Sequence, residues 1–146
     1  MQLDVTDSTP SRALSIDQIA VGDTVTQTVI FDAKASAAFA CLARDSAPIH
    51  ENGEFARQHG FDEPIIQGLA VVGRFSRLMG MYLPGEHAVL QKVEFKFHQP
   101  VFAGRAMLYS CKIQRIVRPL RVVALEVAVS ATGVNHVTGQ CQCLLL

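Results

Sequence analysis

The sequence predicts an α+β domain in which an antiparallel sheet wraps around one long buried helix. Two observations predict this fold class. A segment from residue 67 to about residue 82 is apolar on nearly every side, and such a helix must be covered by other elements. After it, apolar and polar residues alternate in four successive segments up to the end of the chain, as expected for strands with one buried face.

Length and composition fit a single folded domain. The chain has 146 residues, of which 49% are hydrophobic and 18% charged, and its formal net charge is zero. This composition argues against disorder and gives no reason to expect a nucleic-acid or membrane partner. We expect one domain over residues 16–146, preceded by a flexible arm over residues 1–15, because the arm is polar and aperiodic.

The first predicted elements are a strand and two helices. Residues 24–31 are rich in β-branched side chains and predict a strand. Asp32 then stands at the N-cap position of an alanine-rich helix. Asn52 can cap a second, short helix that ends at His59, with Gly60 in the left-handed stop position.

The segment 44–50 lies between these two helices. Pro48 steers the preceding residue, Ala47, away from helical dihedral angles, so the sequence predicts a break there. In a regular helix Asp45 and His50 would point more than a right angle apart, whereas a bent loop can turn both into one pocket. An acid and an imidazole in one pocket can handle the protons of a reaction that adds or removes water.

The long helix is predicted to run from Gln67 to about Tyr82, with three glycines that let neighbouring elements approach closely. It contains Arg74 and Arg77 and is shorter than a membrane span, so a buried central helix is the better interpretation. Four strands are predicted after it, over residues 89–98, 105–117, 121–131 and 135–145, with turns marked by proline or glycine.

The cysteines indicate a reducing environment. All four lie in otherwise apolar periodic segments, and no secretory signal stands at the N-terminus. We therefore expect free buried thiols in a cytoplasmic protein. No metal is expected, because no second pair of ligands stands at metal spacing near Cys141 and Cys143.

Charge is unevenly distributed along the chain. Residues 1–91 contain six Lys or Arg and eleven Asp or Glu, whereas residues 92–146 contain seven and two, so the formal charge changes from −5 to +5. The basic part fits either a rim for a phosphorylated ligand or ordinary solvated strand faces.

Three motifs occur in a fixed order. They are Asp45-x-x-Pro48-Ile49-His50, then Pro64-Ile65-Ile66-Gln67-Gly68, then Phe95-x-Phe97-x-x-Pro100-Val101-x-x-Gly104. In this order and at these separations they resemble the MaoC-like, (R)-specific enoyl-CoA hydratases of the hot-dog fold. The resemblance extends from about Ile16 to the C-terminus.

The resemblance implies a lyase of fatty acid metabolism that hydrates trans-2-enoyl thioesters or dehydrates (R)-3-hydroxyacyl thioesters. Asp45 would be the general base on the water that attacks C3, and His50 would hold that water and help pass its proton to C2. The Gly68 backbone N–H would face the thioester carbonyl oxygen, in keeping with the unpaired amides of a helix N-terminus. The resemblance also implies a homodimer with sheets joined edge to edge, no cofactor, and a CoA or carrier-protein thioester as substrate.

Three positions depart from the family's usual residues. Where the family usually has asparagine, Ala47 cannot form a side-chain hydrogen bond. Where histidine is usual, Gln67 can still donate beside the oxyanion site but cannot change protonation state. Where glycine is usual, Arg44 could pair with Asp45, face solvent or meet a phosphate. Contacts to the pocket or to CoA are expected from Arg44, Ala47, Leu69 and Val72.

Two other functions remain open from the sequence. The first is a hot-dog thioesterase, although thioesterases of this fold tend to carry their acid on or beside the central helix and residues 71–75 contain no carboxylate. The second is a non-catalytic acyl-thioester binder or partner subunit, which the substitutions at Ala47 and Gln67 motivate.

Overall fold

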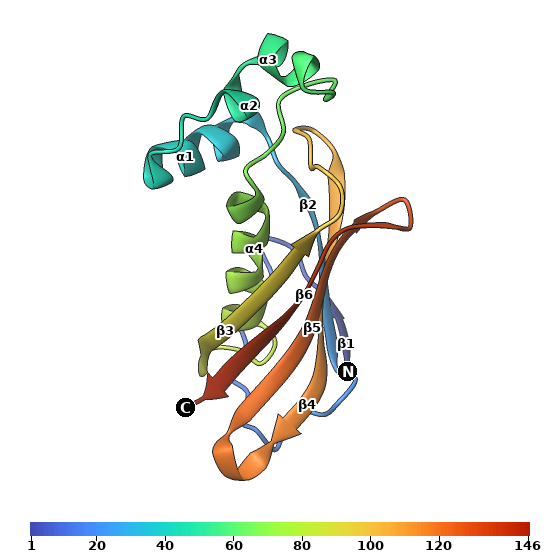
Figure 1. Cartoon of the computed structure of the whole chain (residues 1–146). Helices are drawn as coiled ribbons and strands as arrows, with labels where there is room; N and C mark the ends of the chain where they lie inside the picture. Colours follow the sequence, from blue (N-terminus) through green and yellow to red (C-terminus); the bar gives the residue numbers. More distant parts are fainter.

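The computed structural model describes all 146 residues and shows one six-stranded sheet with the strand order β1-β2-β4-β5-β6-β3 (Figure 1). The strands are β1 (Gln2–Asp4), β2 (Thr24–Ile30), β3 (Ala88–Phe97), β4 (Ala106–Val117), β5 (Val122–Ala131) and β6 (Val134–Leu145). The helices are α1 (Ala33–Ala43), α2 (Pro48–Glu51), α3 (Gly53–Gln58) and α4 (Gly68–Met81), with a 3-10 turn η1 (Arg118–Leu120). None of these helices is long and apolar enough to span a membrane.

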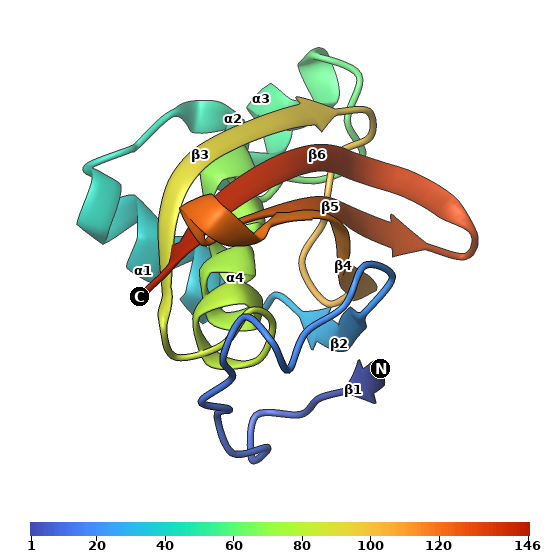
Figure 2. The same ribbon diagram turned by 90° about the horizontal axis from the view of Figure 1, so that it is seen from below.

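The helix α4 lies along the concave face of the sheet, which curves around it (Figure 2). Phe75 of α4 stacks on Phe95 of β3 with ring centroids 5.8 Å apart, and tilts against Tyr109 of β4 at 5.2 Å. Inward-facing side chains of the strands complete a core of 27 buried residues. This arrangement confirms the α+β, hot-dog architecture expected from the sequence. The α4 side chains buried against the sheet are Val71, Val72, Phe75, Leu78 and Met79.

The chain covers α4 on one side only, although its sequence suggested a helix wrapped all round. Leu69 is 67% exposed, and Gly73 and Ser76 continue the same exposed stripe along the helix. Arg74 and Arg77 are half-buried on the flank that faces the N-terminal residues. Leu69 on this stripe is therefore left without a packing partner within one chain.

Residues 1–15, expected to form a flexible arm, pack against the body. The short strand β1 pairs in parallel with β2, and Val5 and Leu14 are buried. The Arg12 N–H donates to the carbonyl of Met81 at 2.7 Å, which ties the arm to the end of α4. The buried side chains of this arm are isolated in a polar stretch, so they produce no periodic signal in the sequence.

Residues 33–67, which contain α1, α2 and α3, extend beyond one end of the sheet, and we call them the helical excursion (Figure 1). Asp32 and Asn52 cap α1 and α3 as predicted, each accepting hydrogen bonds from first-turn amides. Gly60 follows α3 with φ of +86°. No residue of α1 or α2 is buried, and even Leu42 of α1 is 83% exposed.

The strand β3 forms the edge of the sheet opposite β1. Period-two alternation was predicted here, but most of β3 is exposed, and only Ala88 and Phe95 are partly buried. Its exposed apolar side chains are Val89, Leu90, Val93 and Phe97, between 44% and 50% accessible.

Candidate active site

Asp45 follows directly on α1. The helix ends at Arg44, which adopts the left-handed conformation with φ of +54°, and the Asp45 N–H donates back to the carbonyl of Ala40 at 3.0 Å. Oδ1 of Asp45 accepts a hydrogen bond from the Ala47 N–H at 3.1 Å. This local turn orients the carboxylate through the backbone of Ala47, so the bond does not need the side chain that Ala47 lacks.

His50 lies on α2, a single turn that the sequence did not reveal. Pro48 breaks the chain after α1 as predicted, and it then opens α2 from the first helical position, where its missing N–H costs nothing. Nδ1 of His50 lies 2.8 Å from the carbonyl oxygen of Ile65. Since a carbonyl can only accept, Nδ1 carries the proton in this contact and Nε2 is left as the acceptor of a neutral ring.

The structure brings the predicted acid and imidazole together. Nε2 of His50 lies 3.9 Å from Oδ2 of Asp45, and the two side chains are 14% and 36% exposed. The half-exposed carboxylate and the more enclosed ring thus face each other where two adjoining hollows meet. No cluster of three side chains suited to a metal ion occurs in the chain.

The connector before α4 holds this pair in place. The Ile65 N–H donates to the carbonyl of Ile49 at 3.2 Å, and the Ile66 N–H donates to the carbonyl of Val101 at 2.8 Å. The connector is therefore clamped between α2 and the chain that follows β3. The Ile65 carbonyl orients His50, but a backbone group has no signature in a sequence, so this contact could not be predicted.

Gln67 joins α1 to the start of α4. It is only 2% exposed, and its Oε1 accepts a hydrogen bond from Oγ of Ser36 at 2.9 Å. Its Nε2 is buried and has no hydrogen-bond partner in the chain. Ser36 was not identified from the sequence, although a lone hydroxyl in an alanine-rich helix is a signal that could have singled it out.

Gly68 is the first residue of α4, beneath an aromatic ring. A Cβ at this position would come within 3.0 Å of Cε1 of Phe97, so any larger residue would require the ring to shift by a few tenths of an ångström. Gly68 and Phe97 line an apolar hollow of about 380 Å³ together with Phe61, Ile65 and Val71.

The proposed groups occupy three adjoining hollows. His50 lines one of about 290 Å³ and Asp45 another of about 460 Å³, and these two share Ala37, Ala40 and Glu51. The Gly68 hollow shares only Ile66 with the hollow of His50. Within one chain, Asp45 and His50 are thus brought together, while Gly68 opens into the next hollow.

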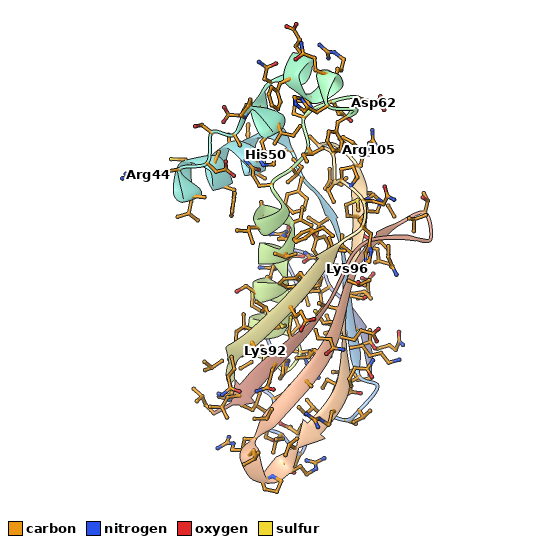
Figure 3. The ribbon with its side chains drawn as sticks, in the orientation of Figure 1. Arg44, His50, Asp62, Lys92, Lys96 and Arg105 are labelled. Atoms are coloured by element: carbon orange, nitrogen blue, oxygen red, sulfur yellow. The ribbon has the colours of Figure 1, made fainter.

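The remaining predicted contacts are dispersed. Arg44 lines the hollow of Asp45 but forms no ion pair with it, and its side chain points away from the body at the outer end of α1 (Figure 3). Leu69 is exposed and Val72 is buried in the core, and neither lines these three hollows.

Fold and site together define a hot-dog domain with a candidate acid–base pair at one end of its central helix. The chain belongs to the family of MaoC-like domains, whose family model matches residues 16–135. It is 28% identical over 128 residues to an (R)-specific enoyl-CoA hydratase of Aeromonas caviae, covering 87% of this chain and 96% of the relative.

A further relative and a solved structure agree with this assignment. A mitochondrial 3-hydroxyacyl-[acyl-carrier-protein] dehydratase of Arabidopsis thaliana is 31% identical over 98 residues, covering 67% of this chain and 58% of the relative. The solved structure of an (R)-hydratase from A. caviae involved in PHA biosynthesis matches with a TM-score of 0.83 at 28% identity, covering 88% of this chain and 98% of that one. Family and fold are thereby those that the three motifs predicted.

Proposed function

We propose that this chain hydrates trans-2-enoyl thioesters or, in the reverse direction, dehydrates (R)-3-hydroxyacyl thioesters. The observation that carries the proposal is the approach of Asp45 and His50 to 3.9 Å in a member of the MaoC-like family. The A. caviae relative, which aligns over nearly its whole length, is named as an (R)-specific enoyl-CoA hydratase and supports the same reaction class.

In the proposed reaction, one water molecule is held by two acceptors. Oδ1 of Asp45 is engaged by the Ala47 N–H, which leaves Oδ2 to receive a proton. Nε2 of His50 is the second acceptor, because Nδ1 donates to the carbonyl of Ile65. A water that gives one hydrogen bond to each directs a lone pair at C3 of the enoyl group.

The electrons and protons of the addition balance as follows. The water oxygen bonds to C3 while Asp45 takes one proton, and the C2–C3 π pair moves toward the thioester carbonyl to give an enolate. The enolate then collapses as C2 receives a proton, which His50 helps to relay, and Asp45 returns to its carboxylate form. Dehydration follows the same steps backwards.

The negative charge on the enolate oxygen would be stabilised by the Gly68 N–H. The first amides of a helix have no partner within it, and the helix dipole adds favourable potential at its N-terminus. Removing one such donor from an enzyme costs about 10²–10³ in rate. The hollow of Gly68 adjoins that of His50 at Ile66, so the thioester carbonyl would lie across this residue.

We also propose that two copies of the chain pair through β3. This strand exposes its backbone edge and its apolar side chains, and the opposite edge of the sheet is already covered by β1. Light scattering should give twice the chain mass of 15.9 kDa, and a value equal to one chain would contradict the pairing.

The role of Asp45 is tested by Asp45→Asn. We expect turnover to fall by about 10²–10⁴ because the base is lost while the shape of the side chain is kept. The loss of enoyl absorbance can be followed with short, medium and branched acyl thioesters, carried by CoA or by a carrier protein. Glu54→Gln is the matched control, because Glu54 is an exposed acid on α3 that lines none of the three hollows, and it should leave turnover nearly unchanged.

Three outcomes would overturn the proposal. Unchanged turnover in Asp45→Asn would remove Asp45 from the mechanism. Release of free thiol from saturated acyl-CoA, without hydration, would indicate a thioesterase. Tight binding of enoyl thioesters without any turnover would indicate an acyl-thioester binder.

A further inference from the structure

The apolar pattern of the core fails at three positions away from the proposed active site. On β2, Val25 and Val29 point inward and are buried, and Gln27 between them is equally buried at 2% exposure. On α4, Arg74 and Arg77 lie one turn apart in an otherwise apolar helix. Burying polar groups in an apolar core costs free energy unless they are hydrogen-bonded or ion-paired. The partner of these three side chains therefore indicates their role.

All three side chains converge on one carboxylate oxygen from the N-terminal arm. Oδ1 of Asp7 accepts hydrogen bonds from Nε2 of Gln27 at 3.1 Å and from Nη2 of Arg74 at 3.3 Å. Nε of Arg77 lies 3.9 Å from the same atom. We call Gln27, Arg74 and Arg77 the anion receptor, because two separate elements of the fold supply its donors to a single anionic group.

The carboxylate of Asp7 fills this receptor incompletely. Its side chain is 79% exposed, whereas those of Arg74 and Arg77 are 35% and 23% exposed. An ion pair with so exposed a partner contributes little to stability. One negative charge faces two guanidinium groups, and Nε of each arginine is buried without a hydrogen-bond partner. The receptor thus has a spare positive charge and spare donors.

A phosphate group matches these spare features. It carries up to two negative charges and several acceptor oxygens, and arginine forks bind such oxygens in pairs. A carboxylate offers one charge and two oxygens. The two positive charges and the spare N–H donors of the receptor therefore favour a phosphate group over the carboxylate that the chain itself supplies.

We propose that Gln27, Arg74 and Arg77 form a binding site for a phosphate group, which Asp7 occupies in the free chain and leaves by rotating its side chain into solvent. The backbone of the arm does not have to move. Nη2 of Arg77 also donates to the main-chain carbonyl of Asp7 at 3.1 Å, and the Tyr82 hydroxyl donates to the carbonyl of Thr9 at 3.0 Å.

The site is separate from the proposed catalytic one. Arg74 lies about 9 Å along the helix axis from Gly68, from the rise per residue of an α-helix. Asp7 belongs to the arm, which precedes the residues 16–135 that match the family model. Phosphate binding here can consequently be measured whether or not the chain proves to be a hydratase.

The test compares inorganic phosphate binding to the unaltered chain and to Asp7→Ala at constant ionic strength. Side-chain NMR signals of the arginine Nε–H and glutamine NH₂ groups report on the receptor directly. Removal of the internal competitor should tighten phosphate binding by about tenfold. Arg74→Gln added to Asp7→Ala should abolish it, and Arg74 is chosen because it makes no other contact to the arm, unlike Arg77.

Asp17→Ala is the matched control. Asp17 is 85% exposed and pairs with a single arginine, Arg118, at 2.9 Å, without a buried amide. This variant loses the same charge but should not bind phosphate more tightly. Equal affinity of the unaltered chain and Asp7→Ala, an equal gain in Asp17→Ala, or binding that survives Arg74→Gln would overturn the proposal. Acetate binding as well as phosphate would overturn the assignment to phosphate.

Discussion

The helical excursion and the body of sheet and α4 are held in different ways. Most of the body's inward side chains belong to the core of 27 buried residues. Within residues 33–67, only Ala56, Ile66 and Gln67 are buried. The segments of the excursion are held in place by individual hydrogen bonds, among them Ser36 to Gln67 and His50 to the carbonyl of Ile65.

This difference separates the two halves of the proposed chemistry. The proton-handling pair stands on a segment whose geometry depends on a few polar contacts, and segments with few buried contacts open locally at low free energy. The Gly68 amide, which we propose stabilises the developing charge, begins a helix that is anchored in the core. We therefore expect substrate entry to move the proposed acid–base pair while the proposed oxyanion site stays fixed.

The largest expected contrast comes from removing an aromatic ring from each region. Phe75→Ala should lower the free energy of unfolding by about 3–5 kcal/mol, because Phe75 is fully buried between Phe95 and Tyr109. Phe39→Ala in α1 should cost about 1 kcal/mol or less, since Phe39 is only half-buried. Urea unfolding measures both, and equal losses would show that the excursion is as firmly packed as the body.

A further effect is expected from alkaline pH, and it belongs to the body alone. Burial raises the pKa of Cys141 to about 11 and that of Cys143 to about 12, from an ordinary value of 9.0. An unfolded chain loses these protons first, so stability present below about pH 9 declines as the pH rises toward 11–12. Each thiol contributes at most about 1.4 kcal/mol per pH unit in this window.

Urea midpoints measured with reductant between about pH 8 and pH 11 test this dependence. Burial also raises the pKa of Tyr109, which adds a decline of the same sign at the upper end. Cys143→Val should make the decline shallower, whereas Cys41→Ser should not, because Cys41 is exposed on α1. A midpoint that stays constant across this range would refute the role of the buried thiols.

The smallest expected effect is confined to the excursion. Asn52→Ala removes the side-chain oxygen that accepts from the N–H groups of Glu54 and Phe55, and such a cap is worth about 1 kcal/mol. Hydrogen exchange at these two amides should accelerate several-fold while the amides of α4 keep their protection. If exchange in α4 accelerates as well, the two regions open as one cooperative unit.

The sequence predicted elements best where one local pattern decides them. Alternation located β4, β5 and β6, and the caps at Asp32 and Asn52 lie where their residue types placed them. The approach of Asp45 to His50 could also be predicted from the sequence, because Pro48 forces the chain to bend between them. In each case the deciding residues lie within one short segment.

Features that depend on partners distant in the sequence could not be predicted from it. The arm looked flexible because its attachment relies on β2 and α4, which are remote in sequence. Ser36 gained a role only when the fold brought it to Gln67, and the carbonyl of Ile65 has no residue type to reveal it. Arg74 and Arg77 stood out as charges in an apolar helix, but their convergence with Gln27 on Asp7 depends on the three-dimensional fold.

The three-residue strand β1 also bears on how many molecules can join. Sheets grow by adding strands at free edges, and a chain with two open edges can propagate into a fibre. Here β1 pairs with the outer edge of β2 and is itself too short to template another strand. This leaves β3 as the one edge at which another strand can be added. If two copies pair through β3 as proposed, edge-to-edge association therefore terminates at two chains.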